Sequence, residues 1–478
     1  MSQAERFEVY ALPIVYGTPK QITADWLRDQ LRLGHLSTAW AARRLLTEGI
    51  GGTSNAHAAS GPMIPGLRAA LVDEADAVLV DEGVVPLIIA RARRENELAG
   101  VYRDACALAK DLADGTDFVI DQLRRRADLT RRGRERLAAK AAALPDAIWR
   151  ASRRAEELIR QALIARQCYL HGHQYQIVDG QIMIVDEYTG RFLPDRQWEH
   201  GLHQAVEAKE SLEITADRET LARMSFQRFY RMYPFLCGMT GTAADASREM
   251  ERVYQRSVMV IPTNRPIARK RRPTRIFRSA EAKWNAIVDS VQQIHAEGRP
   301  VLIGTRSIEA SEFLAQRLTA RGLAHRILNA NFDKEEAELI AVAGSHSAIT
   351  VATNMAGRGT DIRLDREAQA AGGLHVLLTE MHSAKRIDRQ FIGRAGRQGD
   401  PGSSQIFVSL EDELVRLHAP RLAKLIRAVG ADELTGFARQ RAAAVFRMAQ
   451  RHAEARARSQ RADVMRQDDW IDQHMPGR

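Results

Sequence analysis

The chain has 478 residues, 45% of them hydrophobic and 27% charged, with a formal net charge of +10; this composition argues against a disordered chain, and the length predicts about two to four domains. No apolar run approaches the roughly 18–20 residues that cross a bilayer, and the N-terminus lacks the basic and apolar regions of a signal peptide, so we expect a soluble, cytoplasmic protein. The three cysteines are widely spaced and odd in number, which argues against a disulfide framework.

Residues 1–90 form the first segment, in which we expect a strand, a helix, a loop and a second strand. EVYALPIVYG (8–17) is apolar and contains β-branched residues, and ADWLRDQLRLGHLSTAWAARRLL (24–46) repeats Leu, Trp and Ala at helical intervals. GIGGTSNAHAASGPMIPG (49–66) has the Gly, Ser and Pro content of a loop. LVDEADAVLVDEG (71–83) then places carboxylates behind apolar, strand-like runs.

Residues 91–175 differ in composition, because Ala, Arg and Leu repeat there with helical periodicity. Residues 91–170 carry 18 Lys and Arg against 12 Asp and Glu, an excess of +6, and residues 439–478 carry a further +4. Basic surfaces attract nucleic acid, anionic lipid or acidic protein partners. We therefore predict a basic helical insert at 91–175.

Residues 176–268 return to strand and loop chemistry. In HQYQIVDGQIMIVDEYTG (173–190), two β-rich runs flank an Asp-Gly pair, which is the strongest short-range signal for a hairpin. Several helices are expected next. CGMTGT (237–242) and VMVIPTNRP (258–266) again have the composition of strands and loops.

Residues 269–418 alternate regularly between strands and helices. The expected strands are PVLIGTRS, AHRILNA, AITVATN, GGLHVLLTEM and SSQIFVSL, and the expected helices are SIEASEFLAQRLTARG and KRIDRQFIG. This alternation predicts a mostly parallel sheet with helices on both faces. Residues 419–478 are helical in pattern, rich in Ala and Arg and without strand signals.

Acidic residues at the end of one expected strand suggest nucleotide chemistry. Phosphate groups bind at the carboxyl ends of parallel strands, where Asp73 and Glu74 lie. The first carboxylate would hold Mg²⁺, directly or through water, and the second would orient or deprotonate the attacking water. A solvated acidic loop is the alternative interpretation of this short pattern.

A glycine-rich loop follows a later strand in ATNMAGRGTDI (352–362). Gly357 and Gly359 bracket Arg358, and Asp361 follows. Glycines let the backbone approach a ligand closely, and a fixed Arg and Asp can contact phosphate and ribose. An ordinary Gly-rich turn would explain the same residues.

The segment QFIGRAGRQGDPG carries Arg394 and Arg397 three residues apart, a spacing that puts side chains on one side of a helical turn. Two guanidinium groups there could neutralise charge that develops on a γ-phosphate, and a basic surface turn is the alternative. The sequence Thr240-Gly241-Thr242 lies between the first two patterns. Their joint order favours a nucleotide site over three unrelated surface turns.

The order of these patterns is similar to that of the two motor lobes of superfamily 2 ATPases, and in detail it resembles the SecA preprotein translocase ATPase family. The motifs that carry the resemblance span nearly the whole chain: VYGTPKQITADWLRDQL, VDEADAVLVDE, IVDEYTGR, GLHQAVEAKE, GMTGTA, IPTNRP, VLIGTRS, ATNMAGRGTDI, RIDRQFIGRAGRQGDPGSS and SLEDEL. GLHQAVEAKE and IVDEYTGR are not shared by helicases generally.

The resemblance implies an α/β fold with two RecA-like lobes, the first of them incomplete, a helical and hairpin insert, and a C-terminal helical segment. The implied domains are a partial first lobe (1–90), an insert like the family's preprotein cross-linking domain (91–175), the remainder of the first lobe (176–268), the second lobe (269–418) and the start of a helical scaffold (419–478).

The same resemblance implies a role for each candidate residue. Asp73 would associate with Mg²⁺ and Glu74 would be the catalytic base. Arg394 and Arg397 would be arginine fingers. The implied contacts to ATP are Thr240, Gly241, Thr242, Gly357, Arg358, Gly359 and Asp361.

The implied partners are preproteins, the Sec translocon and an anionic membrane surface. The implied location is the cytoplasm, with peripheral association on the cytoplasmic side of the membrane.

The chain departs from the family's pattern in its phosphate-binding loop. That loop needs Gly-Lys-Thr, yet none of the nine lysines here follows a glycine. The family's DEARTPLIIS appears as DEGVVPLIIA, which loses an arginine, and we expect neither the later two-finger region nor a Cys/His zinc motif.

These departures leave open a degenerate or split SecA paralogue without independent ATP hydrolysis, completed by a complementary N-terminal SecA fragment in trans. A start of translation upstream of Met1 is another explanation.

A superfamily 2 helicase is the remaining alternative, because the order of motor motifs and the basic insert both permit it. Nucleic acid is the less favoured partner, since residues 91–170 contain few aromatic side chains on which bases could stack.

Overall fold

The computed structural model describes residues 1–33, 62–84, 86–92, 98–122, 124–185, 192–193, 196–199, 201–215, 218–328, 340, 342–353, 361–427 and 431–474. The loop expected at 49–66 lies mostly outside the described residues, as do Gly357, Arg358 and Gly359. The chain divides into two compact units. Unit 1 comprises Met1–Ala92, Arg218–Pro262 and Glu454–Arg478, and unit 2 comprises Arg93–Asp217 and Thr263–Ala453.

Unit 1 combines paired strands with short helices. Its helices are α1 (Gln3–Tyr10), α2 (Pro19–Leu33), α8 (Phe226–Arg231), α9 (Ser247–Tyr254) and the last part of α17 (Gly436–His474). Its strands are β1 (Ala69–Val72), β2 (Leu87–Ala92), β8 (Arg218–Met224) and β9 (Phe235–Gly238). The pair β1–β9 is parallel and the pair β2–β8 is antiparallel. Buried side chains from α2, α8, α9 and β1 share one apolar core.

The strand expected at 8–17 is wrong, because its first residues belong to helix α1 and residues 11–17 form no strand. A capping box starts this helix: the Ser2 Oγ accepts a hydrogen bond from the Glu5 N–H at 3.3 Å, and the Ser2 N–H donates to the Glu5 Oε2 at 2.6 Å. Two otherwise unsatisfied groups of the first turn are thereby paired. The Ser-x-x-Glu pattern at Ser2–Glu5 was the signal for this helix in the sequence.

The second apolar run of LVDEADAVLVDEG is also not a strand. Only β1 precedes the first carboxylates, and Ala77–Asp81 form a short π-helical turn that buries Val78, Leu79 and Val80. A short apolar run is compatible with either a buried strand or a buried helical turn, so periodicity could not distinguish them.

Helix α17 is tied to other parts of unit 1 by buried polar contacts. The Arg461 guanidinium binds both oxygens of Glu249, at 2.6 and 2.7 Å. The Asp468 Oδ2 accepts a hydrogen bond from the Ser225 N–H at 2.9 Å, at the start of α8. These contacts explain how a helix of largely polar composition is held in place without an apolar face along its whole length.

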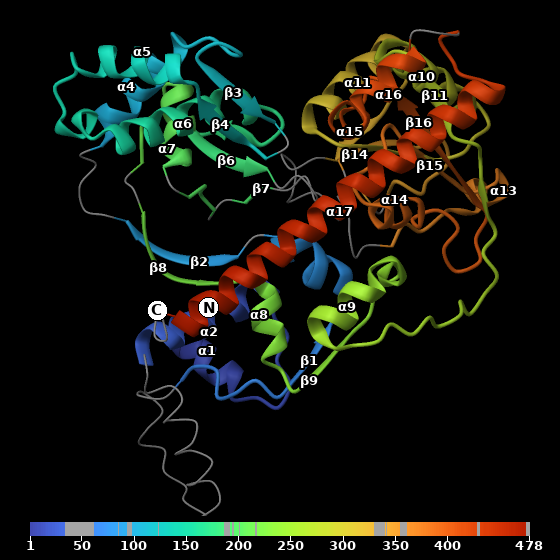
Figure 1. The fold of residues 1–478 in the computed structure, drawn as a ribbon. Helices are drawn as coiled ribbons and strands as arrows, with labels where there is room; N and C mark the ends of the chain where they lie inside the picture. Colours follow the sequence, from blue (N-terminus) through green and yellow to red (C-terminus); the bar gives the residue numbers. More distant parts are fainter. Residues whose placement is uncertain are drawn as a thin grey trace, which may run out of the picture. The chain divides into compact units, whose positions relative to one another are not determined.

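The first part of unit 2, Arg93–Asp217, contains most of the insert expected at 91–175 and the elements that follow it, and these elements lie together in Figure 1. Its helices are α4 (Ala99–Lys110), α5 (Arg131–Ala141), α6 (Ser152–Cys168) and α7 (Leu202–Lys209). Its strands are β3 (Phe118–Asp121), β4 (Arg126–Leu129), β5 (Tyr175–Val178), β6 (Gln181–Val185) and β7 (Phe192–Leu193).

The hairpin expected from the Asp-Gly pair is confirmed. Strands β5 and β6 are antiparallel, and Asp179 and Gly180 between them have φ of 50° and 74°. Positive φ at both central residues is what a tight hairpin turn requires. The sequence did not predict the hairpin β3–β4 within the helical insert, whose two strands have only four residues each.

The rest of unit 2 contains a parallel sheet in the order β10-β16-β15-β12-β14-β13, with β11 also paired to β16. The strands are β10 (Arg269–Arg271), β11 (Arg275–Phe277), β12 (Val301–Thr305), β13 (Arg326–Leu328), β14 (Ile349–Thr353), β15 (Leu374–Leu378) and β16 (Gly402–Ser409). The helices are α10 (Ala280–Ala296), α11 (Ile308–Ala320), α13 (Arg366–Ala370), α14 (Lys385–Ile392), α15 (Glu413–His418) and α16 (Pro420–Arg427). The alternation expected here is therefore confirmed.

Apolar cores cover both faces of this sheet. Alternate strand residues such as Ile303 and Leu377 pack with α10 and α11. Their neighbours along the same strands, such as Leu302 and Leu378, pack with α14 and the first part of α17. Every residue of β12, β14, β15 and β16 is buried, and β12, β14 and β15 therefore read as largely apolar runs in the sequence.

Buried His375 on β15 makes the stability of this sheet sensitive to acid. Its Nδ1 lies 2.8 Å from the Ser403 Oγ, which also accepts a hydrogen bond from Arg299 at 2.7 Å. Burial, followed by the charges of Arg272 and Arg299, lowers the pKa of His375 to about 3. The folded protein therefore keeps this imidazole neutral where an unfolded chain would protonate it.

We expect the contribution of His375 to the free energy of unfolding to fall below pH 6.5, the pKa of an unperturbed histidine, and to keep falling toward pH 3. The slope from His375 should be roughly 1.4 kcal/mol per pH unit, because the unfolded state binds one proton more than the folded state in this range. Urea unfolding at pH 7.5, 6, 5 and 4.5 measures it. His375→Gln should flatten the dependence, and an unchanged slope in this variant would assign the acid sensitivity to other groups.

Candidate nucleotide-binding site

The first candidate site lies where the parallel strands β1 and β9 end. The Met239 N–H donates to the Val72 carbonyl at 2.9 Å, and the Ala75 N–H donates to the Met239 carbonyl at 2.9 Å, so the loops after both strands are hydrogen-bonded to each other. A Cβ on Gly238 would lie 2.6 Å from the Ala75 Cβ, and this close approach needs glycine. The two loops therefore form one rigid structure.

Asp73 and Glu74 project from this structure. Glu74 has a φ of 48°, an uncommon conformation for a residue with a side chain, and its N–H donates to the Asp73 Oδ1 at 2.8 Å. Asp73 is exposed and Glu74 is half-buried. An exposed carboxylate beside a half-buried one on a held backbone is compatible with a metal-associated acid and a base that orients water.

Asp76 joins the acidic segment to the Thr-Gly-Thr segment. It is fully buried and accepts hydrogen bonds from the Thr240 Oγ1 at 2.6 Å and the Thr242 Oγ1 at 2.8 Å. The sequence placed these residues in separate patterns and assigned no partner to Asp76. A carboxylate within an otherwise buried apolar run was the available signal, because a buried charge must be paired.

The second candidate site lies in unit 2, on residues 393–399, which we call the arginine loop. The Arg397 Nη1 binds the Asp361 Oδ1 at 3.1 Å, so two candidate residues far apart in the sequence are neighbours. Arg394 is buried, and its guanidinium lies 5.9 Å from the centre of the Phe391 ring.

The helical spacing expected for Arg394 and Arg397 is wrong. Helix α14 ends at Ile392, before both arginines, and Gly396 has a φ of 65°. The two side chains consequently have different environments, with Arg394 buried and Arg397 exposed. The glycines of the loop end the helix, and their presence in QFIGRAGRQGDPG was a signal in the sequence against helical structure at both arginines.

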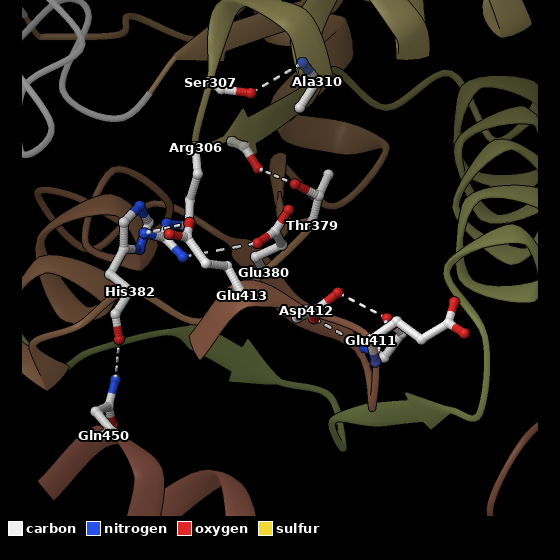
Figure 2. A network of polar contacts seen from close by, with 12 residues as sticks. Arg306, Ser307, Ala310, Thr379, Glu380, His382, Glu411, Asp412, Glu413 and Gln450 are labelled. Atoms are coloured by element: carbon white, nitrogen blue, oxygen red, sulfur yellow. Dashed lines mark hydrogen bonds and ion pairs between the residues drawn. The ribbon is translucent and has the colours of Figure 1, made fainter. Parts of the chain in front are cut away.

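A further polar network lies at the carboxyl ends of β12, β15 and β16 (Figure 2). Arg306 lies 3.8 Å from the Glu380 Oε2 and 3.4 Å from the Glu413 Oε2. Lys283 from α10 is buried and binds the Asp412 Oδ1 at 2.7 Å. Burial and the neighbouring Glu380 raise the pKa of Asp412 to about 6. Arg306, Asp412 and Glu413 lie within the motifs VLIGTRS and SLEDEL, but no role was predicted for them.

The candidate residues thus belong to two groups. Asp73, Glu74, Thr240, Gly241 and Thr242 lie in unit 1, and Asp361, Arg394 and Arg397 lie in unit 2. Within the described ranges, no cluster of three or more His, Cys, Asp or Glu side chains is arranged to hold a metal ion. In the same ranges, no helix combines the length and apolar composition needed to cross a membrane.

Family comparisons place these units in a known context. The profile of the SecA DEAD-like domain matches residues 1–251, and the profile of the SecA P-loop domain matches residues 266–370 and 365–433. Residues 1–251 are more than half of the chain. Both motor lobes of the family are therefore represented.

Whole-chain comparisons agree with these profiles. Protein translocase subunit SecA 2 of Magnetococcus marinus is 40% identical over 480 residues, which cover 100% of this chain and 72% of that protein. The subunit of the same name from Nitrosospira multiformis is 42% identical over 88% of this chain and 62% of its own length. Among solved structures, the DEAD-box protein SrmB of Escherichia coli is 22% identical to this chain, with a TM-score of 0.26. The match covers 35% of this chain and 88% of the SrmB chain. The α/β fold with its parallel sheet, the two family profiles and the identity over the full chain lead to one conclusion: this chain belongs to the SecA family.

Proposed function

We propose that this chain is the nucleotide-binding motor component of a SecA-type system for preprotein targeting and translocation through the Sec translocon. Membership of the family supports this proposal, and the relatives that it matches are named protein translocase subunits. The observation that carries it is the conformation of the backbone at Glu74. The Glu74 N–H donates to the Asp73 carboxylate, and the next N–H, that of Ala75, donates to the Met239 carbonyl in the loop after β9. A base that aims water at a phosphate needs such a fixed backbone.

In this proposal each candidate residue has a defined part in ATP hydrolysis. Asp73 associates with Mg²⁺, and Glu74 orients the attacking water and accepts its proton. Arg394 and Arg397 neutralise the charge on the transferred phosphoryl group. Contacts to the nucleotide come from Thr240, Gly241, Thr242, Gly357, Arg358, Gly359 and Asp361.

The donor set near Asp73 fits Mg²⁺ that is held mainly by nucleotide phosphates. Asp73 is an exposed single carboxylate, and Mg²⁺ usually binds one or two carboxylates together with waters and phosphate oxygens. When bound, the ion would supply charge neutralisation on the phosphates. Asp73 would anchor it on the side of β1.

We further propose that turnover needs a complementary N-terminal SecA fragment. None of the nine lysines follows a glycine, so these 478 residues contain no Gly-Lys-Thr to grip the phosphates. Each charge-assisted donor that such a loop supplies contributes about 1.5–3 kcal/mol. Nucleotide binding by this chain alone should therefore be weak.

The remaining partners follow from the same proposal. Preproteins would contact the basic insert, and the translocon and an anionic membrane surface would recruit the protein to the cytoplasmic side of the membrane. The excess of +6 on residues 91–170 supports an acidic or anionic partner for this part of the chain.

Calorimetric titration with ATP and Mg²⁺, paired with ATPase rates, tests the proposal on the parent, Glu74→Gln and the surface control Glu251→Gln. We expect weak binding and near-background turnover by the parent alone. Addition of a purified SecA N-terminal fragment with a Gly-Lys-Thr loop should raise turnover. Glu74→Gln should then lose roughly 100-fold or more of this rate, as expected for a general base, whereas Glu251→Gln keeps it.

Two results would count against parts of this proposal. Rapid hydrolysis by the parent alone, abolished in Glu74→Gln, would show that no complementary fragment is needed. Absence of ATP binding, both with and without the fragment, would show that the protein does not act through ATP. It would then favour a paralogue that does not hydrolyse ATP.

A further inference from the structure

We infer that Arg269 and Gln450 are positioning residues that hold α14 at its two ends and thereby position the arginine loop that follows it. Neither belongs to the patterns that suggest nucleotide binding, and neither is on the loop or on α14. The inference rests on the proposed function in one respect, namely that Arg394 and Arg397 act on the nucleotide. The hydrogen bonds that carry it are independent of that function.

The first contact lies where α14 passes into the arginine loop. The Arg269 Nη1 donates to the Ala395 carbonyl at 2.8 Å and to the Ile392 carbonyl at 3.2 Å. Ile392 is the last residue of α14, and the final carbonyls of a helix have no partner within the helix. Arg269 supplies the donors from the edge strand β10 and adds a positive charge at the negative end of the helix dipole.

The backbone of the loop is shaped around the same arginine. Gly396 has a φ of 65°, and a Cβ there would lie 2.8 Å from the Arg269 Cβ. Arg265, four residues earlier, donates from its Nη1 to the Gln398 carbonyl at 3.0 Å. Two arginines of one extended segment therefore bind three carbonyls in and beside the loop, and these bonds fix its path.

The second contact lies at the other end of α14, where Asp388 is in the first turn. Its Oδ1 accepts from the His382 N–H at 2.9 Å and lies 2.7 Å from the His382 Nδ1. The Gln450 Nε2 donates to the Asp388 Oδ2 at 2.8 Å and to the His382 carbonyl at 2.9 Å. Figure 2 shows the Gln450 amide directed at the His382 carbonyl.

Burial makes this second contact specific. Gln450 is 5% exposed and Asp388 is 4% exposed, so water cannot replace the amide donor if it is removed. Gln450 belongs to α17, and its side chain connects this helix to the carboxylate at the start of α14. The orientation of α14 is therefore set from α17 at one end and from β10 at the other.

These two contacts at the ends of α14 should affect the positions of Arg394 and Arg397 more than the strands of the sheet. Helix α14 has only eight residues, and Arg394 and Arg397 follow its end without regular structure of their own. A displacement of about 1 Å in a charged group can cost about 100-fold in rate, because electrostatic stabilisation of a reacting phosphate depends on placement. Loss of either contact should consequently loosen the loop while the strands beneath it stay intact.

Hydrogen exchange measured by mass spectrometry on the full chain, without nucleotide, tests the inference. We expect Arg269→Gln and Gln450→Leu each to accelerate exchange of the amides in 385–400 by roughly tenfold or more, with exchange in β12 and β14 unchanged. Arg269→Lys should restore most of the protection, because an ammonium group also donates to carbonyls. The matched control is Arg271→Gln, an exposed arginine two residues along the same strand.

The functional readout is the affinity for N-methylanthraniloyl-ATP. It is measured in the presence of the complementary fragment, at a temperature below that at which the protein begins to unfold. The two variants should bind about tenfold more weakly than the parent, with Arg269→Lys close to the parent. Unchanged exchange in 385–400 in both variants would overturn the inference whatever the parent binds. A parent that binds no nucleotide would instead overturn the proposed function, and the exchange data would still decide whether these residues hold the loop.

Discussion

Lys283→Met should lower the free energy of unfolding at pH 7.5 by about 3–5 kcal/mol, the cost of leaving one charge of a buried pair without its partner. Lys283 is 1% exposed, and its Nζ lies 2.7 Å from Asp412 and 3.9 Å from Glu380. Asp412 also accepts hydrogen bonds from the Ser409 N–H and Oγ, at 2.8 and 2.7 Å. These neutral donors remain in the variant, but the buried carboxylate loses its counter-ion.

The effect of Lys283→Met should be smaller at pH 5 than at pH 7.5. Burial already raises the pKa of Asp412 to about 6, above its ordinary value of 3.8, and loss of the ammonium raises it further. An acid whose pKa is raised on folding destabilises the protein as pH rises above the unfolded value, because the folded state must then either keep a proton that the unfolded state has released or bury a charge. At pH 5 the variant therefore keeps a neutral Asp412.

Urea unfolding of the full chain at the two pH values measures this difference. Lys424→Met, on the exposed side of α16, is the matched control and should change stability by less than about 0.5 kcal/mol. Lys283→Met/Asp412→Leu should recover much of the loss, since it removes both charges. A loss below about 1 kcal/mol at pH 7.5 in the single variant would mean that the buried pair contributes little.

Asp76→Ala should lower the free energy of unfolding of unit 1 by about 2–4 kcal/mol. The substitution removes a fully buried carboxylate that accepts hydrogen bonds from Thr240 at 2.6 Å and Thr242 at 2.8 Å, and both hydroxyls lose this charged acceptor. Hydrogen bonds to a charged group contribute about 1.5–3 kcal/mol each, and loss of the buried charge itself offsets part of that sum. Scanning calorimetry of the full chain measures the shift.

Two variants calibrate the Asp76 result. Thr242→Val keeps the shape of the side chain and removes one hydroxyl, so its effect should be about half as large. Glu251→Ala, on an exposed position of α9, should leave the transition unchanged. Equal effects of Asp76→Ala and Glu251→Ala would contradict a stabilising role for the buried carboxylate.

Local sequence patterns predicted two kinds of element: strands in which every residue is buried, and a hairpin whose turn residues, Asp and Gly, favour a tight turn. The strands β12, β14 and β15 read as apolar runs because each of their residues is buried, and Gly180 marked the hairpin β5–β6. The strand at 8–17 failed because an N-terminal capping box competed with β-branched composition. The short apolar run 77–80 failed because a buried helical turn has the same composition as a buried strand.

Short patterns in the sequence predict which residues form the candidate site, but they do not predict the contacts that those residues make. Asp73, Glu74 and Arg397 were identifiable from short patterns, but their neighbours come from distant parts of the chain. Asp76 and Thr240 are 164 residues apart, and Gln450 and Asp388 are 62 apart. No local periodicity contains such pairings, since they depend on which strands become neighbours in the folded sheet.

The contact of Asp76 with Thr240 and Thr242 has a consequence for how this protein can change in evolution. One carboxylate serves two hydroxyls, and one of those hydroxyls also accepts a hydrogen bond from the Thr242 N–H at 3.2 Å. Loss of Asp76 removes the acceptor of both hydroxyls, and loss of either threonine removes one donor from the buried carboxylate. Descendants of this sequence should therefore retain all three residues or replace them together. The segments that contain Asp76 and Thr240–Thr242 should consequently vary jointly, although they lie far apart in the gene.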